Sequence, residues 1–273
     1  MLHKNNNSSS ISRLFDEDPD RGNDFSLIKS GWLFDYSRTP LTRADREGLL
    51  DLPRRKGLRQ SVERLFDGAI VNPSEAQPAL HMQLRSHQTS ADIQADRRRM
   101  LALADQWHTG VAGYTDLLHV GIGGSDLGPR LVADALDQGD SSVRVHWLST
   151  LDGRRLDRLL AGLDVDRTAV VIASKSFSTE ETMAQAQAIR AWLGENFTRS
   201  AWASTANVDR AVAFGVQPEH ILPFPVWTGG RYSLWSSVGV SAAAAVGADR
   251  FVAMGKSAAG VDRDFRSSPD GNS

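Results

Sequence analysis

The order of apolar and polar residues divides the chain into two parts with different periodicities. Between residues 11 and 115, apolar side chains recur at helical spacing, and no run of strands is evident. One predicted helix carries its apolar face on Leu58, Val62, Leu65 and Phe66, and Gly68 is placed to end it. A second helix is predicted from Asp92 to Trp107, with the basic run at 97–99 on its solvated face.

From residue 116, short apolar runs alternate with helical segments. Strands are predicted at 117–122, 143–148, 168–173, 201–204 and 220–224. Helices are predicted between them at 126–136, 152–160, 179–193 and in a short segment before Gly215, and beyond them at 233–246 and 249–265. Repeated β-α-β units form parallel sheets with helices on both faces. The fold class is therefore α/β, a doubly wound parallel sheet preceded by a mainly helical N-terminal region.

Three local details follow from the same patterns. The predicted helix at 126–136 is expected to place Pro129 near its first turn and to turn five side chains inward, namely Leu127, Leu131, Val132, Ala135 and Leu136. Ser178 and Glu181 have the spacing of a capping box at the start of the 179–193 helix. His119, on the first strand of the sheet, is expected to be a buried, hydrogen-bonded core residue.

Composition excludes several classes of function. The 273 residues carry a formal net charge of −2, so the chain lacks the basic surface typical of nucleic-acid and membrane partners. There is no cysteine, and the seven histidines show no helical metal-ligand spacing, so no metal site is predicted. Neither a signal peptide nor an apolar stretch long enough to cross a bilayer is found. We expect a cytoplasmic protein.

The first candidate loop, Gly-Ile-Gly-Gly-Ser-Asp-Leu-Gly at 121–128, joins a strand to a helix. A dinucleotide fingerprint needs glycine where this chain has Asp126, and a P-loop needs Gly-Lys-Ser/Thr where Gly128 is followed by Pro129. Use of NAD or ATP is therefore not expected. Glycines let a ligand approach the backbone, and Ser125 offers a hydroxyl. A strand–helix turn without a ligand is the alternative.

The second candidate loop, Ser174–Thr179, places four hydroxyls and one lysine ahead of a helix. Hydroxyls, backbone N–H groups and a positive helix end together suit a phosphate dianion. Simple helix capping, the alternative, needs one hydroxyl rather than four. In the third segment, Gly229-Gly230-Arg231, the arginine supplies a permanent cation that either stabilises an anionic intermediate or holds a carboxylate of the fold.

Three segments, Val120–Pro129, Ile172–Thr182 and Gly229–Trp235, together closely resemble the motifs of the glucose-6-phosphate isomerases, in the order of that family. Weaker similarity at 35–37, 79–85 and 151–153 extends the resemblance over residues 25–267. The resemblance implies an aldose–ketose isomerase that interconverts D-glucose 6-phosphate and D-fructose 6-phosphate in glycolysis and gluconeogenesis. Its partner would be a small-molecule sugar phosphate, and it would need no metal or organic cofactor.

The resemblance also assigns residues to the site. Gly124, Ser125 and Gly230 would line the substrate site, and Arg231 would stabilise the enediolate intermediate. The 6-phosphate would be bound by Ser174, Lys175, Ser176 and Thr179. Val226 and Thr228 depart from the aspartate and valine usual ahead of Gly-Gly-Arg.

By the same resemblance, the chain is similar to the N-terminal half of such an enzyme. Residues 1–24 are expected to form a poorly ordered tail, 25–115 a helical region, 116–232 a sugar-isomerase-type domain, and 233–273 a helical segment leading to a second domain. The family's catalytic glutamate, histidine and lysine match no segment of this sequence, so this polypeptide alone is expected to be inactive. The complete enzyme would be a homodimer.

Two other readings remain. A non-catalytic module that binds sugar phosphates would use the same loops without the missing base. A nucleotide-binding dehydrogenase domain is disfavoured because both glycine fingerprints are incomplete.

Overall fold

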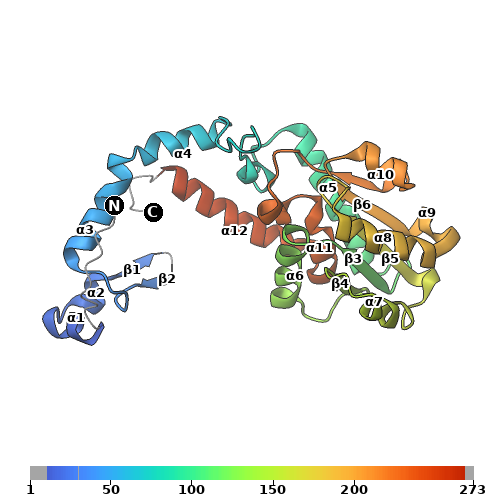
Figure 1. Ribbon diagram of the computed structural model, residues 1–273, viewed down its shortest axis with the longest axis horizontal. Helices are drawn as coiled ribbons and strands as arrows, with labels where there is room; N and C mark the ends of the chain where they lie inside the picture. Colours follow the sequence, from blue (N-terminus) through green and yellow to red (C-terminus); the bar gives the residue numbers. More distant parts are fainter. Residues whose placement is uncertain (1–10, 30, 268–273) are drawn as a thin grey trace. The chain divides into compact units, whose positions relative to one another are not determined.

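The computed structural model describes residues 11–29 and 31–267, which form two compact units (Figure 1). Within the described residues, one unit extends to Ser61 and the other comprises Val62–Ser267. Each unit is described by itself. No helix in the described parts of the chain is both long and apolar enough to cross a membrane.

The first unit contains helices and one hairpin. Helices α1 (Ile11–Glu17) and α2 (Arg21–Asp24) precede strands β1 (Ser26–Lys29) and β2 (Trp32–Asp35), which pair antiparallel. Helix α3 (Arg43–Arg55) follows, with a capping box between Thr42 and Asp45, and α4 (Leu58–Phe66) begins in this unit and ends in the second.

The expectation of a poorly ordered tail at 1–24 is wrong for residues 11–24, and residues 1–10 lie outside the described residues. The buried Arg21 side chain fixes this segment because its guanidinium donates to the carbonyls of Ser37 and Thr39, both at 2.7 Å, and lies 4.1 Å from the centre of the Phe25 ring. The hairpin corrects the prediction that 25–115 lacks strands. Four-residue strands are too short to show a period of two.

The second unit is a doubly wound α/β domain, which confirms the predicted fold class (Figure 1). Its strands are β3 (Asp116–Val120), β4 (Arg144–Leu148), β5 (Thr168–Ala173), β6 (Ala201–Thr205) and β7 (Ile221–Pro223). All neighbouring strands are parallel, in the order β4-β3-β5-β6-β7. The helices are α5 (Ala91–His108), α6 (Gly124–Leu136), α7 (Gly153–Leu160), α8 (Glu180–Leu193), α9 (Phe197–Ser200), α10 (Val208–Phe214), α11 (Val240–Val246) and α12 (Ala248–Ser267).

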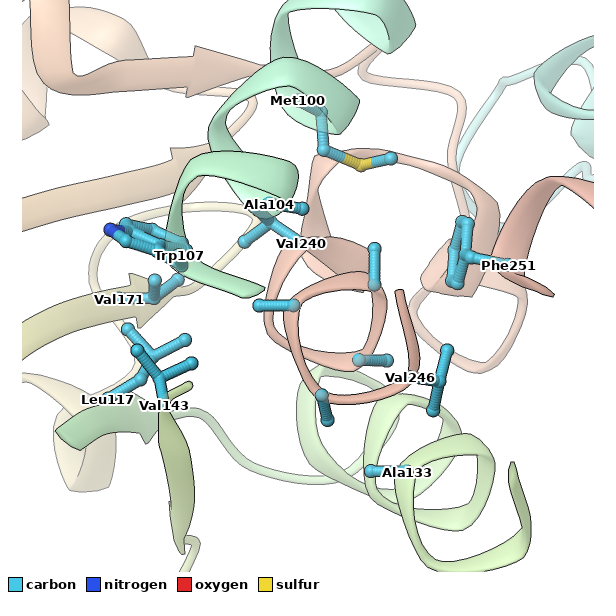
Figure 2. Close-up of a cluster of buried hydrophobic side chains, with 14 of the residues drawn as sticks. Met100, Ala104, Trp107, Leu117, Ala133, Val143, Val171, Val240, Val246 and Phe251 are labelled. Atoms are coloured by element: carbon cyan, nitrogen blue, oxygen red, sulfur yellow. The ribbon is translucent and has the colours of Figure 1, made fainter. Parts of the chain in front are cut away.

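Alternate residues of the central strand face opposite layers of helices. Val171 of β5 packs with α5, α6 and α11, whose buried side chains include Trp107, Ala133 and Val240 (Figure 2). Val170 of the same strand faces the layer of α7–α10. A strand buried on both faces reads as a continuous apolar run, which is why β5 was predicted with its observed bounds.

The domain boundary expected at residue 116 is not where the chain divides. Helix α5 belongs to the second unit because Met100, Ala104 and Trp107, all almost completely buried, are part of the core beneath the sheet. The Arg97–Arg99 run is also not simply solvated. Arg97 donates to the carbonyls of Leu84 and Ser86, and Arg99 donates to those of Glu219 and Ile221.

Helix α6 begins at Gly124, two residues earlier than predicted, and a different set of its side chains faces the core. Asp126, Pro129, Val132 and Ala133 are buried, whereas Leu127 and Leu131 are 65% and 68% exposed. Ala135 is exposed as well. The prediction that all five apolar side chains of this helix turn inward is therefore wrong for three of them. Pro129 lies in the second turn rather than the first.

Two further local predictions are corrected. The capping box at Ser178 and Glu181 does not form, because α8 begins at Glu180 after Thr179 and the Ser178 hydroxyl instead donates to Ser176 Oγ at 2.8 Å. Of the predicted helix at 233–246, only 240–246 is α-helical. Gly230–Trp235 and Ser237–Gly239 form 3₁₀ turns, in which serine hydroxyls bond to nearby backbone and compete with α-helical pairing.

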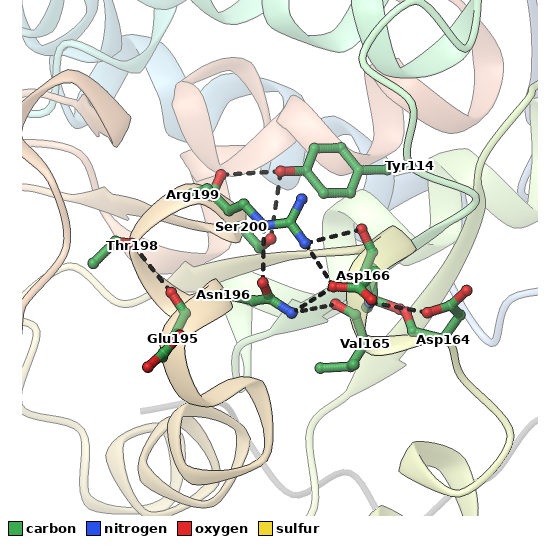
Figure 3. Close-up of polar contacts among 10 residues, drawn as sticks. Tyr114, Asp164, Val165, Asp166, Glu195, Asn196, Thr198, Arg199 and Ser200 are labelled. Carbon is green, nitrogen blue, oxygen red and sulfur yellow. Dashed lines mark hydrogen bonds and ion pairs between the residues drawn. The ribbon is translucent and has the colours of Figure 1, made fainter.

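The amino ends of the strands are closed by paired polar groups (Figure 3). The Asp166 carboxylate accepts hydrogen bonds from Arg199 at 2.8 Å and Asn196 at 3.0 Å, and the Tyr114 hydroxyl donates to the Arg199 carbonyl at 3.0 Å. Nearby, His146 Nε2 lies 2.7 Å from an Asp116 carboxylate oxygen. These pairs join the strands and the segments that precede them at this end of the sheet.

Candidate functional site

The candidate site lies where the strand order of the sheet reverses. Numbered as they occur along the sheet domain, the strands are arranged 2-1-3-4-5, so chain connections diverge between β3 and β5. Helix α6 after β3 covers one face and α8 after β5 covers the other. In open α/β sheets, the crevice beyond the carboxyl ends of strands at this point is the usual ligand site. The two loops singled out in the sequence follow these two strands.

The glycine loop meets the Gly-Gly-Arg segment through backbone atoms. A Cβ atom on Gly124 would lie 2.1 Å from the carbonyl carbon and oxygen of Gly230 and 2.6 Å from the Arg231 nitrogen. The Ser233 hydroxyl stabilises this contact, because it donates to the Gly230 carbonyl at 2.8 Å and lies 3.3 Å from the Gly124 carbonyl. The structure thus brings Gly124, Gly230 and Arg231 together, and glycine at 124 is required by the space available.

His119 is buried in the core, as predicted, and it supports the start of α6. Pro129 has no N–H, so the Ser125 carbonyl lacks the helical donor it would otherwise have. His119 Nε2 supplies that hydrogen bond at 2.6 Å, and Nδ1 lies 2.8 Å from the Ser241 hydroxyl. Since a carbonyl only accepts, the proton is on Nε2. Complete burial lowers the pKa of His119 to about 4, which makes it a structural group and not a base at neutral pH.

The Ser174–Thr179 loop turns sharply into α8. Phe177 adopts a left-handed backbone conformation with φ of 49°, and its buried ring packs on Phe214 at 5.9 Å between ring centres. A non-glycine residue there is unusual and is found mostly at turns and functional sites. Ser174 is only 2% exposed, and its Oγ lies 3.0 Å from that of Thr179. Ser174 is therefore closed to solvent, and its hydroxyl positions Thr179.

An open cavity of about 380 Å³ lies over this loop. It is lined by Lys175, Ser176, Thr179, Ala206, Asn207 and Val226. Three of the four residues assigned to phosphate binding therefore share one cavity. The Lys175 ammonium is 3.5 Å from a Glu75 carboxylate oxygen, a partly exposed ion pair of the kind that a bound anion can replace. Asn207 and Val226 were not singled out from the sequence.

The Arg231 side chain is exposed, and no hydrogen bond or ion pair joins it to a residue of the described ranges. The segment before it is held instead. The Gly229 N–H donates to His81 Nε2 at 2.9 Å, and the His81 ring lies 4.4 Å from that of Tyr232. Burial, followed by the charges of Arg85 and Lys175, lowers the pKa of His81. Sequence reasoning grouped His81 with structural and surface histidines. The only signal for it was the weak motif at 79–85.

The neighbouring Thr228 side chain is completely buried, and its hydroxyl has no hydrogen-bond partner among the described residues. Val226, the other departure from the expected motif, is 53% exposed and lines the cavity. No group of three or more potential metal ligands occurs within residues 11–29 and 31–267.

Comparison with known proteins identifies one family. The family model for phosphoglucose isomerase matches residues 35–272. The chain is 38% identical over 271 residues to a glucose-6-phosphate isomerase of Xanthomonas oryzae pv. oryzae strain PXO99A, covering 96% of this chain and 53% of that protein. It is 37% identical over 283 residues to one from Pseudomonas syringae pv. syringae strain B728a, covering 95% and 51%.

A solved structure gives the same result. A glucose-6-phosphate isomerase from Chlamydia trachomatis superposes with a TM-score of 0.77 at 25% sequence identity, over 96% of this chain and 53% of that one. The chain thus spans about half the length of the relatives it matches.

Proposed function

Because the chain belongs to the phosphoglucose isomerase family, we propose that it forms the sugar-phosphate-binding half of an aldose–ketose isomerase acting on D-glucose 6-phosphate and D-fructose 6-phosphate. The observation that carries the proposal is the cavity lined by Lys175, Ser176 and Thr179 at the switch point of the sheet. A phosphate dianion there would meet one ammonium, two hydroxyls and the N-terminus of α8. These are the groups that favour anions at strand–helix loops.

The remaining assigned residues have separate roles in the proposal. Ser174 positions Thr179 through their 3.0 Å contact. Gly124, Ser125 and Gly230 line the path of the sugar in this proposal, as the family resemblance implies, and the close packing of Gly124 on Gly230 brings the two segments together. Arg231, exposed and unpaired within the described residues, stabilises the negative charge of a cis-enediolate as the proton moves between C2 and C1. Neither a metal nor an organic cofactor takes part.

The proposed reaction also needs a base that this cavity does not offer. None of the six lining residues is a carboxylate or an imidazole, and the nearby Glu75 is paired with Lys175. A positioned general base contributes about 10²–10⁴-fold to such a step. We therefore propose that the chain by itself binds sugar phosphate but turns it over at a negligible rate. A sensing module without catalysis is the second candidate, and the absent base favours it.

The arrangement of the complete enzyme is part of the proposal. The Val62–Ser267 unit contains its first sugar-isomerase-type domain, and a second domain of the same type completes the enzyme. The enzyme acts in the cytoplasm as a homodimer whose subunits share each active site.

Calorimetric titration with 6-phosphogluconate tests the phosphate assignment. The double variant Ser176→Ala/Thr179→Val removes two donors at the cavity, and each lost charge-assisted bond should cost about 1.5–3 kcal/mol of binding free energy. Ser257→Ala on α12 removes an exposed hydroxyl that bonds only within its own helix and serves as the control. Equal affinity in the double variant and the control would reject the assignment.

A coupled isomerase assay separates the two candidates. The purified chain is assayed alone and after addition of the C-terminal half of a homologous isomerase. Activity that appears only on addition supports the isomerase, and its absence in a complex shown to form supports the sensing module. Robust turnover by the chain alone would mean that the base has been misplaced.

A further inference from the structure

His81 joins two parts of the site that are distant in sequence. It lies in the 3₁₀ turn His81–Leu84, and its Nε2 accepts the N–H of Gly229, 148 positions along the chain. A Cβ atom on Gly229 would lie 3.1 Å from that same nitrogen, so the ring is seated directly against the backbone. Gly229 is two residues before Arg231, whose own side chain is tied to no other described residue.

The hydrogen bond determines the protonation state of the ring. Since Gly229 N–H donates, Nε2 must carry a lone pair, and the proton of the neutral ring is on Nδ1. The charged groups that act on His81 are Arg85, which follows its turn and pairs with Asp262, and Lys175 of the phosphate loop, which pairs with Glu75. The other rings against it are those of Tyr232 and Trp227. Burial and these two cations oppose the imidazolium form, and the pKa of His81 is lowered from its ordinary value.

We propose that His81 is a positioning residue that, as a neutral acceptor, holds the Gly229–Arg231 segment in place. The inference rests on the proposed function. Gly124 supports the segment on one side through close backbone packing, and His81 supports it through the hydrogen bond at Gly229. A protonated His81 has no lone pair for Gly229, so the segment is released and Arg231 is no longer aimed at the sugar.

Acid breaks the contact with Gly229. Protonation of His81 removes the lone pair that accepts the Gly229 N–H. A ligand that needs the Gly229–Arg231 segment in place therefore favours the neutral ring and binds less well when His81 is protonated. The prediction is a site that holds carboxylate-bearing sugar phosphates less well in acid than the phosphate group alone accounts for.

Two substitutions separate the hydrogen bond from the ring. His81→Phe retains a ring beside Tyr232 but has no acceptor. His81→Gln places a non-titrating carbonyl oxygen where Nε2 lies. The full chain is used in both cases, and hydrogen exchange of the Gly229 amide is followed by NMR at one pH. We expect exchange about five- to tenfold faster in His81→Phe, the effect of losing one hydrogen bond, and near wild-type exchange in His81→Gln.

Ligand binding provides the second measurement. The probes are 6-phosphogluconate, whose C1 carboxylate can meet Arg231, and sorbitol 6-phosphate, which has no charge at C1. His81→Phe should weaken the first by about fivefold and the second by less, because one hydrogen bond that aims Arg231 is lost. As pH falls from 7.5 to 5, wild type should lose affinity for 6-phosphogluconate relative to His81→Gln. The ratio removes the titration of the ligand's phosphate, whose second pKa is near 6.

The outcomes are separable. If neither ligand binds wild type, the proposed function fails, while the Gly229 exchange rates still decide the role of His81. If both bind wild type and all three proteins show the same Gly229 exchange and the same preference between ligands, the inference is overturned and the proposed function stands. If His81→Phe does not fold, a wild-type to His81→Gln affinity ratio that is flat with pH overturns it.

Discussion

The two ends of the parallel sheet carry similar polar residues, but the hydrogen-bonding groups of those residues are paired differently at the two ends. At the amino end, Asp166 accepts hydrogen bonds from Arg199 and Asn196 (Figure 3), and Asp116 meets His146, so these polar groups have partners within the fold. At the carboxyl end, Arg231 is exposed without a partner among the described residues, and Thr228 buries an unpaired hydroxyl. Phe177 adds a left-handed backbone at the same end.

The difference is between polar groups that pair within the fold and polar groups that do not. Groups that pair within the fold gain little from a ligand, whereas unpaired donors and cations are available to one. Strained and unsatisfied groups cost free energy and persist where the surrounding structure holds them. The carboxyl end can tolerate them because the apolar core on both faces of the sheet lies directly beneath. Four substitutions test this contrast.

The largest effect is expected for Gly124→Ala at the carboxyl end. The new methyl would lie 2.1 Å from backbone atoms of Gly230, which cannot move aside as a side chain can, so unfolding free energy should fall by about 3 kcal/mol. Urea denaturation measures this. Gly128→Ala is the matched control on the same helix, since its methyl would contact Leu234 at an ordinary 3.5 Å. A variant at 124 as stable as this control would show that the backbone contact is not tight.

Acid should destabilise the carboxyl end through His119. Its folded pKa of about 4 lies below the ordinary 6.5, so the unfolded chain binds the proton more tightly. The stability contribution is fully present above pH 6.5 and is lost as pH falls toward 4, by about 3 kcal/mol over the whole range. We compare unfolding free energies of wild type and His119→Gln between pH 7 and 4. Their difference should shrink with acid, and a constant difference would contradict the assignment.

Thr228→Val should stabilise the protein. The substitution removes a completely buried hydroxyl with no partner among the described residues and keeps the shape of the side chain. Relief of an unsatisfied buried group is expected to raise unfolding free energy by about 1 kcal/mol. Thermal denaturation detects this as a higher Tm. Thr205→Val is the comparison, because the Thr205 hydroxyl is hydrogen-bonded to the backbone of Lys175 and Asn207. This variant should be less stable than wild type.

Asp166→Asn at the amino end should have the smallest effect. The ion pair with Arg199 is largely exposed, so its loss should cost at most about 1 kcal/mol of stability. Affinity for 6-phosphogluconate should not change. Titration of this variant beside Ser176→Ala/Thr179→Val contrasts the two ends directly, and weaker ligand binding by Asp166→Asn would break the comparison.

Local sequence patterns predicted much of the fold and the strand ends at which the two candidate loops lie. The bounds of β5 were predicted as observed, since a continuous β-branched run defines a strand buried on both faces. The loops at 121–128 and 174–179 were identified by their glycines and hydroxyls. The prediction for the helix at 126–136 failed in which of its faces is buried. Helix α6 packs on the fold through Pro129, Val132 and Ala133, and Leu127 and Leu131 are exposed.

The sequence by itself determined the α/β alternation, the positions of the two candidate loops and the family, because each depends on neighbours within a few residues. Only the tertiary structure decided which distant groups meet. It packs Gly124 on the peptide of Gly230 and brings His81 to Gly229. It also places His119 to bond the Ser125 carbonyl, which lacks a helical donor because of Pro129. Such contacts depend on how whole elements pack across the sheet, and no local periodicity encodes which backbone group will lie within 3 Å of a given ring.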